Sequence, residues 1–177
     1  MNFSIQLTLE NDQVVLNPLQ ETDYAELYAV ASDPAIWAQH PTKDRWQEPV
    51  FQNFFQQAIA SNGAFKIVNK ATGQTIGTTR FYDYAPADDS IMIGYTFYAT
   101  ASWGTGINPA VKKLMMDYIF NYVSKVYFQV GASNRRSQIA VSRLGARKIA
   151  EQVLTYAGEQ PKPNFVYEIT RAEWSGK

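Results

Sequence analysis

The sequence of 177 residues has no cysteine and a single histidine, His40. Without cysteine the chain forms no disulfide, no thiolate metal site and no cysteinyl acyl-enzyme. A zinc centre or a Ser-His-Asp triad would depend on His40, which stands beside Pro41 in an expected loop. We therefore expect no metal site, and the simpler interpretation of His40 is a solvated loop side chain.

The sequence also lacks a long apolar run and an excess of charge of either sign. No stretch approaches the roughly 18 apolar residues that cross a bilayer, and the first residues lack the basic and apolar regions of a signal peptide. Sixteen Lys and Arg balance sixteen Asp and Glu, whereas a nucleic-acid-binding protein normally carries a basic stripe. We expect a cytoplasmic protein with one domain over residues 1–177, and neither nucleic acid nor a membrane as partner.

What the sequence does contain is an alternation of strand and helix patterns. Alternating apolar residues predict a hairpin within 5–19, and helical spacing predicts helices within 21–32 and from Pro49 to Gly63. Residues 33–49 contain three prolines and are expected to form a structured loop. Further helices are expected from about Pro109 and within 133–146, and further strands at 64–69, 74–84, 90–98, 125–130, 147–156 and 164–174. This order predicts an α/β fold with one mixed, partly antiparallel sheet.

Two glycines precede the helix expected in the middle of the chain, in the stretch Trp103-Gly104-Thr105-Gly106-Ile107-Asn108-Pro109. Asn108 is a good N-cap and Pro109 a good first helical residue. Glycine in such a turn lets backbone N–H groups converge near the positive end of the helix dipole, which favours a phosphate or pyrophosphate. The turn alone is equally explained by a connection that needs two glycines for its shape. A Rossmann fingerprint would need a third glycine at Pro109, and the lysine of a Walker A loop is absent.

Several motifs together resemble one known family. The strand "IGYTF", the turn "WGTGIN" and the following helix resemble the acetyl-CoA-binding core of the GNAT acetyltransferases. At the right distance, Asn134-Arg135-Arg136-Ser137 and Leu144-Gly145-Ala146 resemble the family's Asn-x-x-Ser/Ala helix and its Leu-Gly end. The first and last segments resemble the branch of the ribosomal-protein, or Rim-type, N-acetyltransferases. The resemblance implies a GNAT fold of about seven strands flanked by about four helices.

The resemblance also implies a co-substrate and residues that bind it. Acetyl-CoA would place its pyrophosphate on the glycine turn and its pantetheine arm along the preceding strand, before "KVYFQV" separates from it. The implied contacts are Tyr95, Thr96, Phe97, Tyr98, Trp103, Gly104, Thr105, Gly106, Ile107, Asn108, Asn134 and Ser137. Asn134 is equally well explained as a helix cap. Lys112 and Lys113 are expected on a solvated helix face, with contact to the 3′-phosphate as the alternative.

The sequence departs from the family pattern where catalysis is concerned. Ala101 replaces a Gln or Arg of the turn motif, Met92 replaces a common Glu, and Val141 replaces a common Tyr acid. Residues 152–157 lack the Arg and His of the Rim-type segment. As substitutes we consider Ser137 as proton donor to the thiolate and Asp83 as base, although a helix-start hydroxyl and a turn-forming Asp are the simpler interpretations. Tyr156 and Glu168 are weaker candidates, and Trp37, Phe81 and Tyr82 are candidates for an acceptor pocket or for the core.

Three functions remain open from the sequence. The first is an acetyl-CoA-dependent N-acetyltransferase, monomeric or homodimeric, that transfers acetyl directly to a primary amine of a protein N-terminus or a small molecule. The second is a catalytically impaired acyl-CoA-binding protein of the same fold, which the missing Glu, Tyr, Arg and His favour. The third is an interaction module with an occluded cleft.

Overall fold

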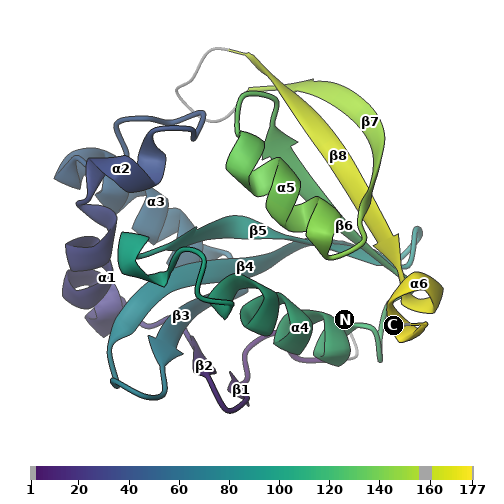
Figure 1. Cartoon of the computed structure of the whole chain (residues 1–177), viewed down its shortest axis with the longest axis horizontal. Helices are drawn as coiled ribbons and strands as arrows, with labels where there is room; N and C mark the ends of the chain where they lie inside the picture. Colours follow the sequence, from purple (N-terminus) through teal and green to yellow (C-terminus); the bar gives the residue numbers. More distant parts are fainter. Residues whose placement is uncertain (1–2, 156–160, 177) are drawn as a thin grey trace.

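The computed structural model describes residues 3–155 and 161–176, and their strands form one mixed sheet (Figure 1). The eight strands of this described part stand in the order β1-β2-β3-β4-β5-β6-β8-β7. They comprise β1 (Leu9–Glu10), β2 (Val14–Pro18), β3 (Ala64–Asn69), β4 (Thr75–Ala85), β5 (Ser90–Tyr98), β6 (Lys125–Gly131), β7 (Arg147–Leu154) and β8 (Lys162–Thr170). All neighbours pair antiparallel except β5 and β6.

Helices cover both faces of the sheet (Figure 1). One face is packed by α1 (Tyr24–Ala31) and α3 (Glu48–Ala60), and the other by α4 (Ile107–Ile119) and α5 (Arg135–Arg143). Short helical segments complete the described chain: η1 (Glu21–Asp23), α2 (Pro34–Trp37), η2 (Thr100–Ser102) and α6 (Arg171–Ser175). No helix in this part of the chain is both long and apolar enough to cross a membrane.

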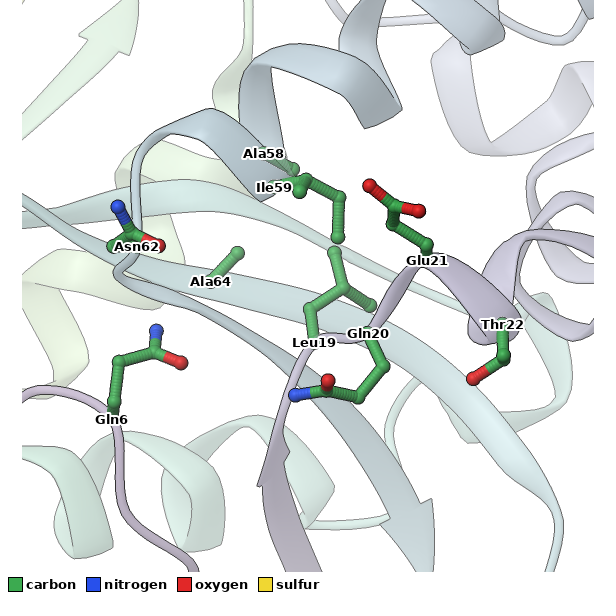
Figure 2. Close-up of a pocket in the computed structure, with 9 residues that line it drawn as sticks. All are labelled: Gln6, Leu19, Gln20, Glu21, Thr22, Ala58, Ile59, Asn62 and Ala64. Carbon is green, nitrogen blue, oxygen red and sulfur yellow. The ribbon is translucent and has the colours of Figure 1, made fainter.

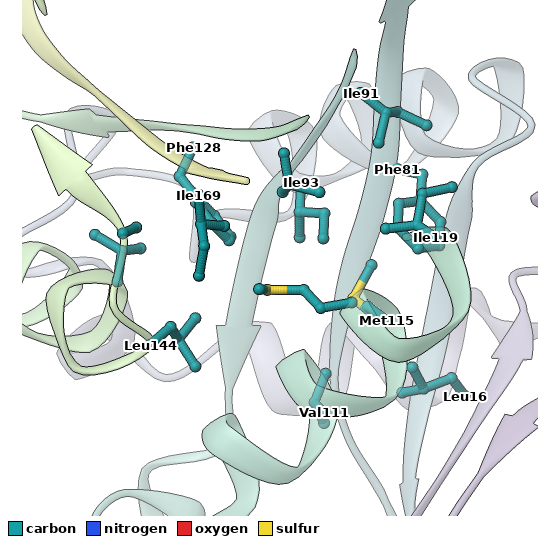
Figure 3. Packing of buried hydrophobic residues seen from close by; sticks show 14 of the residues in the cluster. Leu16, Phe81, Ile91, Ile93, Val111, Met115, Ile119, Phe128, Leu144 and Ile169 are labelled. Carbon is teal, nitrogen blue, oxygen red and sulfur yellow. The ribbon is translucent and has the colours of Figure 1, made fainter. Parts of the chain in front are cut away.

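The two faces carry separate apolar clusters. Under α4 and α5, mainly aliphatic and methionine side chains pack together with a few aromatic rings, and Figure 3 shows Val111 and Met115 of α4 pointing toward Ile93 of the sheet. Under α1 and α3 the cluster is aromatic, with Phe51, Phe54, Phe55, Trp37 and Phe97 among its members. This division follows from the alternation of strand side chains, which sends successive residues to opposite faces.

The parallel pair β5 and β6 opens soon after it begins. Only Ser90–Met92 of β5 pair with Lys125–Tyr127 of β6, so the rest of both strands diverges. β5 nevertheless remains paired with β4, and β6 remains paired with β8. A wedge therefore opens in the middle of the sheet, along the unpaired edge of β5.

A β-bulge marks β5 at the same level. The register with β4 shifts between Thr78 and Arg80, and Tyr95 has a positive φ of 51°. Such a φ is strained for a bulky residue. The bulge reverses the alternation of side chains, so Ile93 packs in the α4 cluster whereas Tyr95 packs against the aromatic cluster.

The sequence predicted most of these elements correctly. A strand is present at each expected place, and the sheet is mixed as expected, with eight strands rather than about seven among the described residues. The strand expected over 164–174 was wrong at its end: β8 stops at Thr170, and Arg171–Ser175 form α6. The expected start of α4 was wrong: the helix begins at Ile107, and Gly106 is its N-cap with φ of 88°. The Asn108 side chain instead accepts a hydrogen bond from the Tyr98 hydroxyl (3.0 Å). The short helices α2 and α6 were not predicted.

Candidate active site

A cleft of about 860 Å³ follows the wedge between β5 and β6. Its walls are formed by β5, the glycine turn, the first turns of α4, the end of β6, helix α5, and the segment from α2 toward α3. Its volume lies in the range of small-molecule and cofactor sites. The cleft is open in the structure, which argues against the interaction module with an occluded cleft.

The glycine turn forms one end of this cleft. Gly104 and Gly106 have φ of 75° and 88°, and a Cβ at either position would meet no atom within 4 Å. Their backbone conformation therefore favours glycine, and the space above them is open. The first N–H groups of α4 have no partner within the helix. The turn thus has the geometry of an anion site, in agreement with its sequence pattern.

Two residues of the turn lie away from the cleft wall. Thr105 is exposed, and its hydroxyl donates to the carbonyl of Ser102 (2.8 Å). Ile107 is buried in the α4 cluster, so only its backbone can face a ligand. The Trp103 indole N–H donates to the carbonyl of Tyr98 (3.3 Å), which fixes the ring beside the cleft.

The edge of β5 forms the long wall. Tyr95, Thr96, Phe97 and Tyr98 all line the cleft. Burial raises the pKa of Tyr98, whose hydroxyl is bound to Asn108. Because β6 has diverged here, the β5 backbone is free to pair with an extended ligand, as a sheet edge does.

The position of Lys112 contradicts the expectation that its side chain lies on a solvated helix face. It is only 4% exposed, and its ammonium donates to the hydroxyls of Thr96 (2.7 Å) and Thr79 (3.0 Å) at the bulge. Burial lowers its pKa to about 7. Lys112 is therefore neither on a solvated face nor placed to reach a phosphate outside the cleft, whereas its neighbour Lys113 is exposed and pairs with Asp117 (2.6 Å). The helical spacing of Lys112 from Met115 and Met116 was the signal for its burial.

Helix α5 forms the opposite wall and begins at a capped end. The Asn134 side chain accepts from the backbone N–H of Ser137 (3.1 Å), so Asn134 is a helix N-cap, which was one of its two equally weighted interpretations. Asn134, Ser137 and Val141 all line the cleft. The hydroxyl of Ser137 is half-buried there, next to the position where the family pattern would place a tyrosine.

Arg136 ties three segments together across the cleft. Its guanidinium donates to the carbonyl of Ile36 in α2 (3.0 Å), and its backbone N–H donates to the Gln39 side chain (3.2 Å). The guanidinium carbon also lies 3.9 Å from the centre of the Trp103 ring. This places a cation beside the glycine turn, where Ala101 leaves the usual Gln or Arg of the turn motif absent.

Two of the three residues expected in an acceptor pocket line the cleft. Tyr82 and Trp37 line it, although Trp37 is only 2% exposed and donates its indole N–H to the carbonyl of Ala31 (2.7 Å). Phe81 does not reach the cleft, because the alternation of β4 points it into the α4 cluster on the other face. Phe81 is thus a core residue.

The expected bases are not brought to the cleft. Asp83 is exposed, with φ of 49°, just before the turn that ends β4, and it does not line the cleft. Glu168 lies on β8 and pairs with Arg147 (3.3 Å). Tyr156 lies outside the described residues. Asp83 lies within β4, at a shift of register with β5, and the turn follows Ala85, so the turn-forming interpretation was also wrong.

His40 is a cleft residue and not the solvated loop side chain that was expected. Its Nδ1 accepts from the backbone N–H of Thr42 (2.9 Å), and its Nε2 lies 3.3 Å from Nη1 of Arg45. Burial, and then the charge of Arg45, lower the pKa of His40 to about 3. The imidazole is therefore neutral near pH 7, and such a group is a weak general base.

The charges on the cleft wall have one sign. No Asp or Glu lines the cleft among residues 3–155 and 161–176, whereas five cationic residues do: Arg45, Lys112, Arg135, Arg136 and Arg143. A carboxylate base for an amine is thus absent from the described wall. Among residues 3–155 and 161–176, no group of three or more His, Asp or Glu side chains is placed to hold a metal ion.

A separate pocket of about 470 Å³ lies near the start of α1 and the end of α3. Figure 2 shows the side chains of Leu19 and Ile59 pointing toward one another, and Gln20, Glu21, Thr22 and Asn62 also line the pocket. Its side chains provide no cation and no paired acid and base. The cleft at the wedge is therefore the candidate active site.

Comparison with known proteins agrees with this geometry. A sequence profile of the family described as "Acetyltransferase (GNAT) domain" matches residues 13–147. A probable GNAT acetyltransferase from Chromobacterium violaceum is similar in structure, with a TM-score of 0.83 and 18% identity over 96% of this chain and 89% of that one.

Two further solved structures share the fold. A GCN5-related N-acetyltransferase from Brucella melitensis has a TM-score of 0.78 and 20% identity over 96% of this chain and 81% of its own. Mycobacterium smegmatis RimJ, solved with CoA-disulfide, has a TM-score of 0.72 and 16% identity over 95% of this chain and 89% of its own. At these identities the structures show the fold, while the profile match covers most of the sequence. The chain therefore belongs to the GNAT acetyltransferase family.

Proposed function

We propose that this protein is an acetyl-CoA-dependent N-acetyltransferase that transfers acetyl directly to a primary amine. The observation that carries this proposal is the wedge between β5 and β6, which ends at the open turn of Gly104 and Gly106. Membership of the GNAT family implies acetyl-CoA as the acetyl donor. The Rim-type branch and a protein N-terminus as acceptor are extensions that rest on the sequence resemblance.

The residues present fit acetyl-CoA as co-substrate. The open space above Gly104 and Gly106 fits a pyrophosphate, which the N–H groups at the start of α4 would bind. The unpaired edge of β5 from Tyr95 to Tyr98 fits the amides of a pantetheine arm. Arg136 beside Trp103 would supply positive charge near the phosphates.

The reaction would need two proton transfers and no covalent enzyme intermediate. The amine nitrogen forms a bond to the acetyl carbon, the carbon–sulfur bond breaks, and the departing thiolate takes up a proton. We assign that proton to the Ser137 hydroxyl, which lines the cleft. The proton lost by the amine goes to solvent, because Asp83 lies away from the cleft and no described carboxylate lines it.

One observation favours the second candidate, a catalytically impaired acyl-CoA-binding protein. The described cleft wall lacks an acidic side chain, and Val141 occupies the position of the family's tyrosine acid. This candidate predicts that acyl-CoA binds while no amine is acetylated above the background rate.

Release of free CoA thiol in the presence of a panel of primary amines separates the two candidates. The proposal predicts amine-dependent thiol release and an N-acetylated product detectable by mass spectrometry. Saturable acetyl-CoA binding without any product would establish the impaired protein instead.

A further inference from the structure

The end of the cleft away from the glycine turn gathers cations around the ring of Phe54. The guanidinium carbon of Arg45 lies 4.6 Å from the centre of this ring, and that of Arg80 lies 5.7 Å from it. Aromatic faces attract cations but do not neutralise their charge. Two guanidinium groups are thus held near one another, in a region where the described cleft wall offers no carboxylate.

Arg80 is the more deeply buried of these cations. It is 5% exposed, its guanidinium carbon lies 4.2 Å from the centre of the Tyr95 ring, and its Nε has no hydrogen-bond partner among the described residues. It also forms no ion pair in that part of the chain. A buried charge of this kind is unfavourable unless an opposite charge comes near. Arg80 stands directly behind Tyr95, which lines the cleft.

Arg45 is the cation that faces the cleft. It lines the wall, its guanidinium donates to the Thr42 hydroxyl (3.2 Å), and its guanidinium carbon lies 5.2 Å from the centre of the Trp37 ring. Contacts to Trp37 and Phe54 hold the guanidinium plane in place, which reduces the entropy lost when a ligand binds. A planar guanidinium presents several N–H donors that suit carboxylate and phosphate oxygens.

Besides burial, nearby positive charges lower the pKa of His40, which indicates that the electrostatic potential at this end of the cleft is positive. After burial, the largest influence that lowers its pKa is the charge of Arg45, and Lys162 acts in the same direction. Lys162 donates to the carbonyl of Pro41 (2.6 Å), so it too lies at this end of the cleft. The surroundings of His40 therefore disfavour a further positive charge and favour a negative one.

We propose that the acceptor is a primary amine that also carries a negatively charged group, and that Arg45, supported by Arg80 behind Tyr95, binds this group. The inference rests on the proposed N-acetyltransferase function and narrows its substrate class. Polyamines and lysine-rich peptides would bring additional positive charge to a cleft that already holds five Lys and Arg on its described wall. Such acceptors are therefore disfavoured.

Matched amine pairs test this inference. We would compare 4-aminobutyrate with 4-aminobutyramide, and phosphoethanolamine with ethanolamine, with spermidine as the cationic comparison. Within each pair the expected kcat/KM is at least about tenfold higher for the anionic amine, because it gains a charge-assisted hydrogen bond. The two pairs distinguish a carboxylate from a phosphate as the preferred group.

Arg45→Gln should raise the acceptor KM and bring the ratio within each pair close to one, without change in the KM for acetyl-CoA. Arg45→Lys should retain part of the preference, because the charge remains. Lys43→Gln is the matched control: Lys43 is exposed in the same loop and does not line the cleft, so the ratio should stay as in the parent protein.

Equal or higher activity with the neutral amine or with spermidine would overturn the inference while leaving the acetyltransferase intact. If no amine is turned over, calorimetric binding of each pair to the protein saturated with CoA still measures the preference. Tighter binding of the anionic member, lost in Arg45→Gln, would support the anion site even though the proposed reaction had failed. Equal binding within both pairs would overturn it.

Discussion

The ammonium of Lys112 in α4 donates a hydrogen bond to the hydroxyl of Thr96 in β5, at 2.7 Å. The two hydroxyls of Thr96 and Thr79 also lie 2.8 Å apart, so one buried cation joins both sides of the bulge to the helix. None of these partners is charged. This cluster sits where the cleft passes between the sheet and α4.

Replacement of Lys112 should therefore change stability in a pH-dependent way. Its pKa is about 7 in the folded chain and about 10.5 when unfolded, so the unfolded state binds more protons between these values. The unfavourable burial is thus largest below pH 7 and disappears as the pH approaches 10.5. The increase in Tm caused by Lys112→Met should be several degrees larger at pH 6 than at pH 10, because the substitution removes the buried charge. The hydroxyls of Thr79 and Thr96 can still hydrogen-bond to each other in the variant.

Thermal denaturation of both proteins across pH 6 to 10 measures this difference. Lys113→Met is the control, since Lys113 is exposed on the same helix and should show little pH dependence. A Tm difference for Lys112→Met that does not vary with pH would contradict the buried, uncompensated cation.

Substitution of a glycine in the turn has two effects that can be measured separately, namely backbone strain and loss of the open space above the turn. Gly104→Ala and Gly106→Ala each force a left-handed conformation on alanine, which costs roughly 1–2 kcal/mol. Gly73→Ala has the same kind of strain, at φ of 69° with open space around it, in the β3–β4 turn far from the cleft. We expect all three to lower Tm similarly, but only Gly104→Ala and Gly106→Ala to weaken CoA binding, by about tenfold or more.

Isothermal titration with CoA reads out this comparison in the folded variants. Loss of affinity in Gly73→Ala to the same degree would mean that strain, and not the space above the turn, determines binding.

His40 should make the protein sensitive to acid. Its folded pKa of about 3 lies below its ordinary value of 6.5, so the unfolded state binds more protons between these two values. The contribution of the buried neutral imidazole is fully present above pH 6.5 and is lost as the pH falls toward 3. His40→Asn should flatten the loss of Tm over this range, as measured by circular dichroism. An unchanged slope would show that other groups cause the acid sensitivity.

Ser137 is the residue on which the proposed proton transfer depends. Ser137→Ala should lower kcat by about a hundredfold to ten-thousandfold, a typical effect of losing a general acid, with little change in the affinity for CoA. Ser142→Ala on the same helix is the matched control, because Ser142 is exposed and does not line the cleft. If Ser137→Ala retains full kcat under single-turnover conditions, the thiolate takes its proton from elsewhere.

The parts of the fold that depend on local pattern were predictable. The strand at Ala64–Asn69 was predicted with its observed bounds, since alternating apolar residues and flanking turn residues define it. The helix α6 was missed although Thr170 and Glu173 form a readable capping box. The start of α4 was missed because Gly106 at positive φ replaces Asn108 as cap, which frees Asn108 to bind Tyr98.

The electrostatics of the site depend on contacts between distant segments. The bulge at Tyr95 is set by pairing with β4, so no local pattern indicates that Ile93 and Tyr95, two positions apart, face opposite sides of the sheet. Arg80 was missed because its burial follows from the Phe54 ring of α3, 26 positions earlier. Asp83 was considered as a base because it lies near the end of a central strand, but it stands at an irregular part of β4 with φ of 49°, where it is exposed and does not line the cleft.

The central claim is that the CoA moiety of acetyl-CoA binds in the cleft between β5 and β6, with its pyrophosphate at the turn of Gly104 and Gly106. It is tested most directly by a thermal-shift titration with acetyl-CoA, free CoA and a nicotinamide dinucleotide, because a ligand that binds the folded state raises Tm according to its affinity. We predict saturable shifts with acetyl-CoA and CoA, and none with the dinucleotide. No shift with either CoA compound, or an equal shift with the dinucleotide, would contradict the claim.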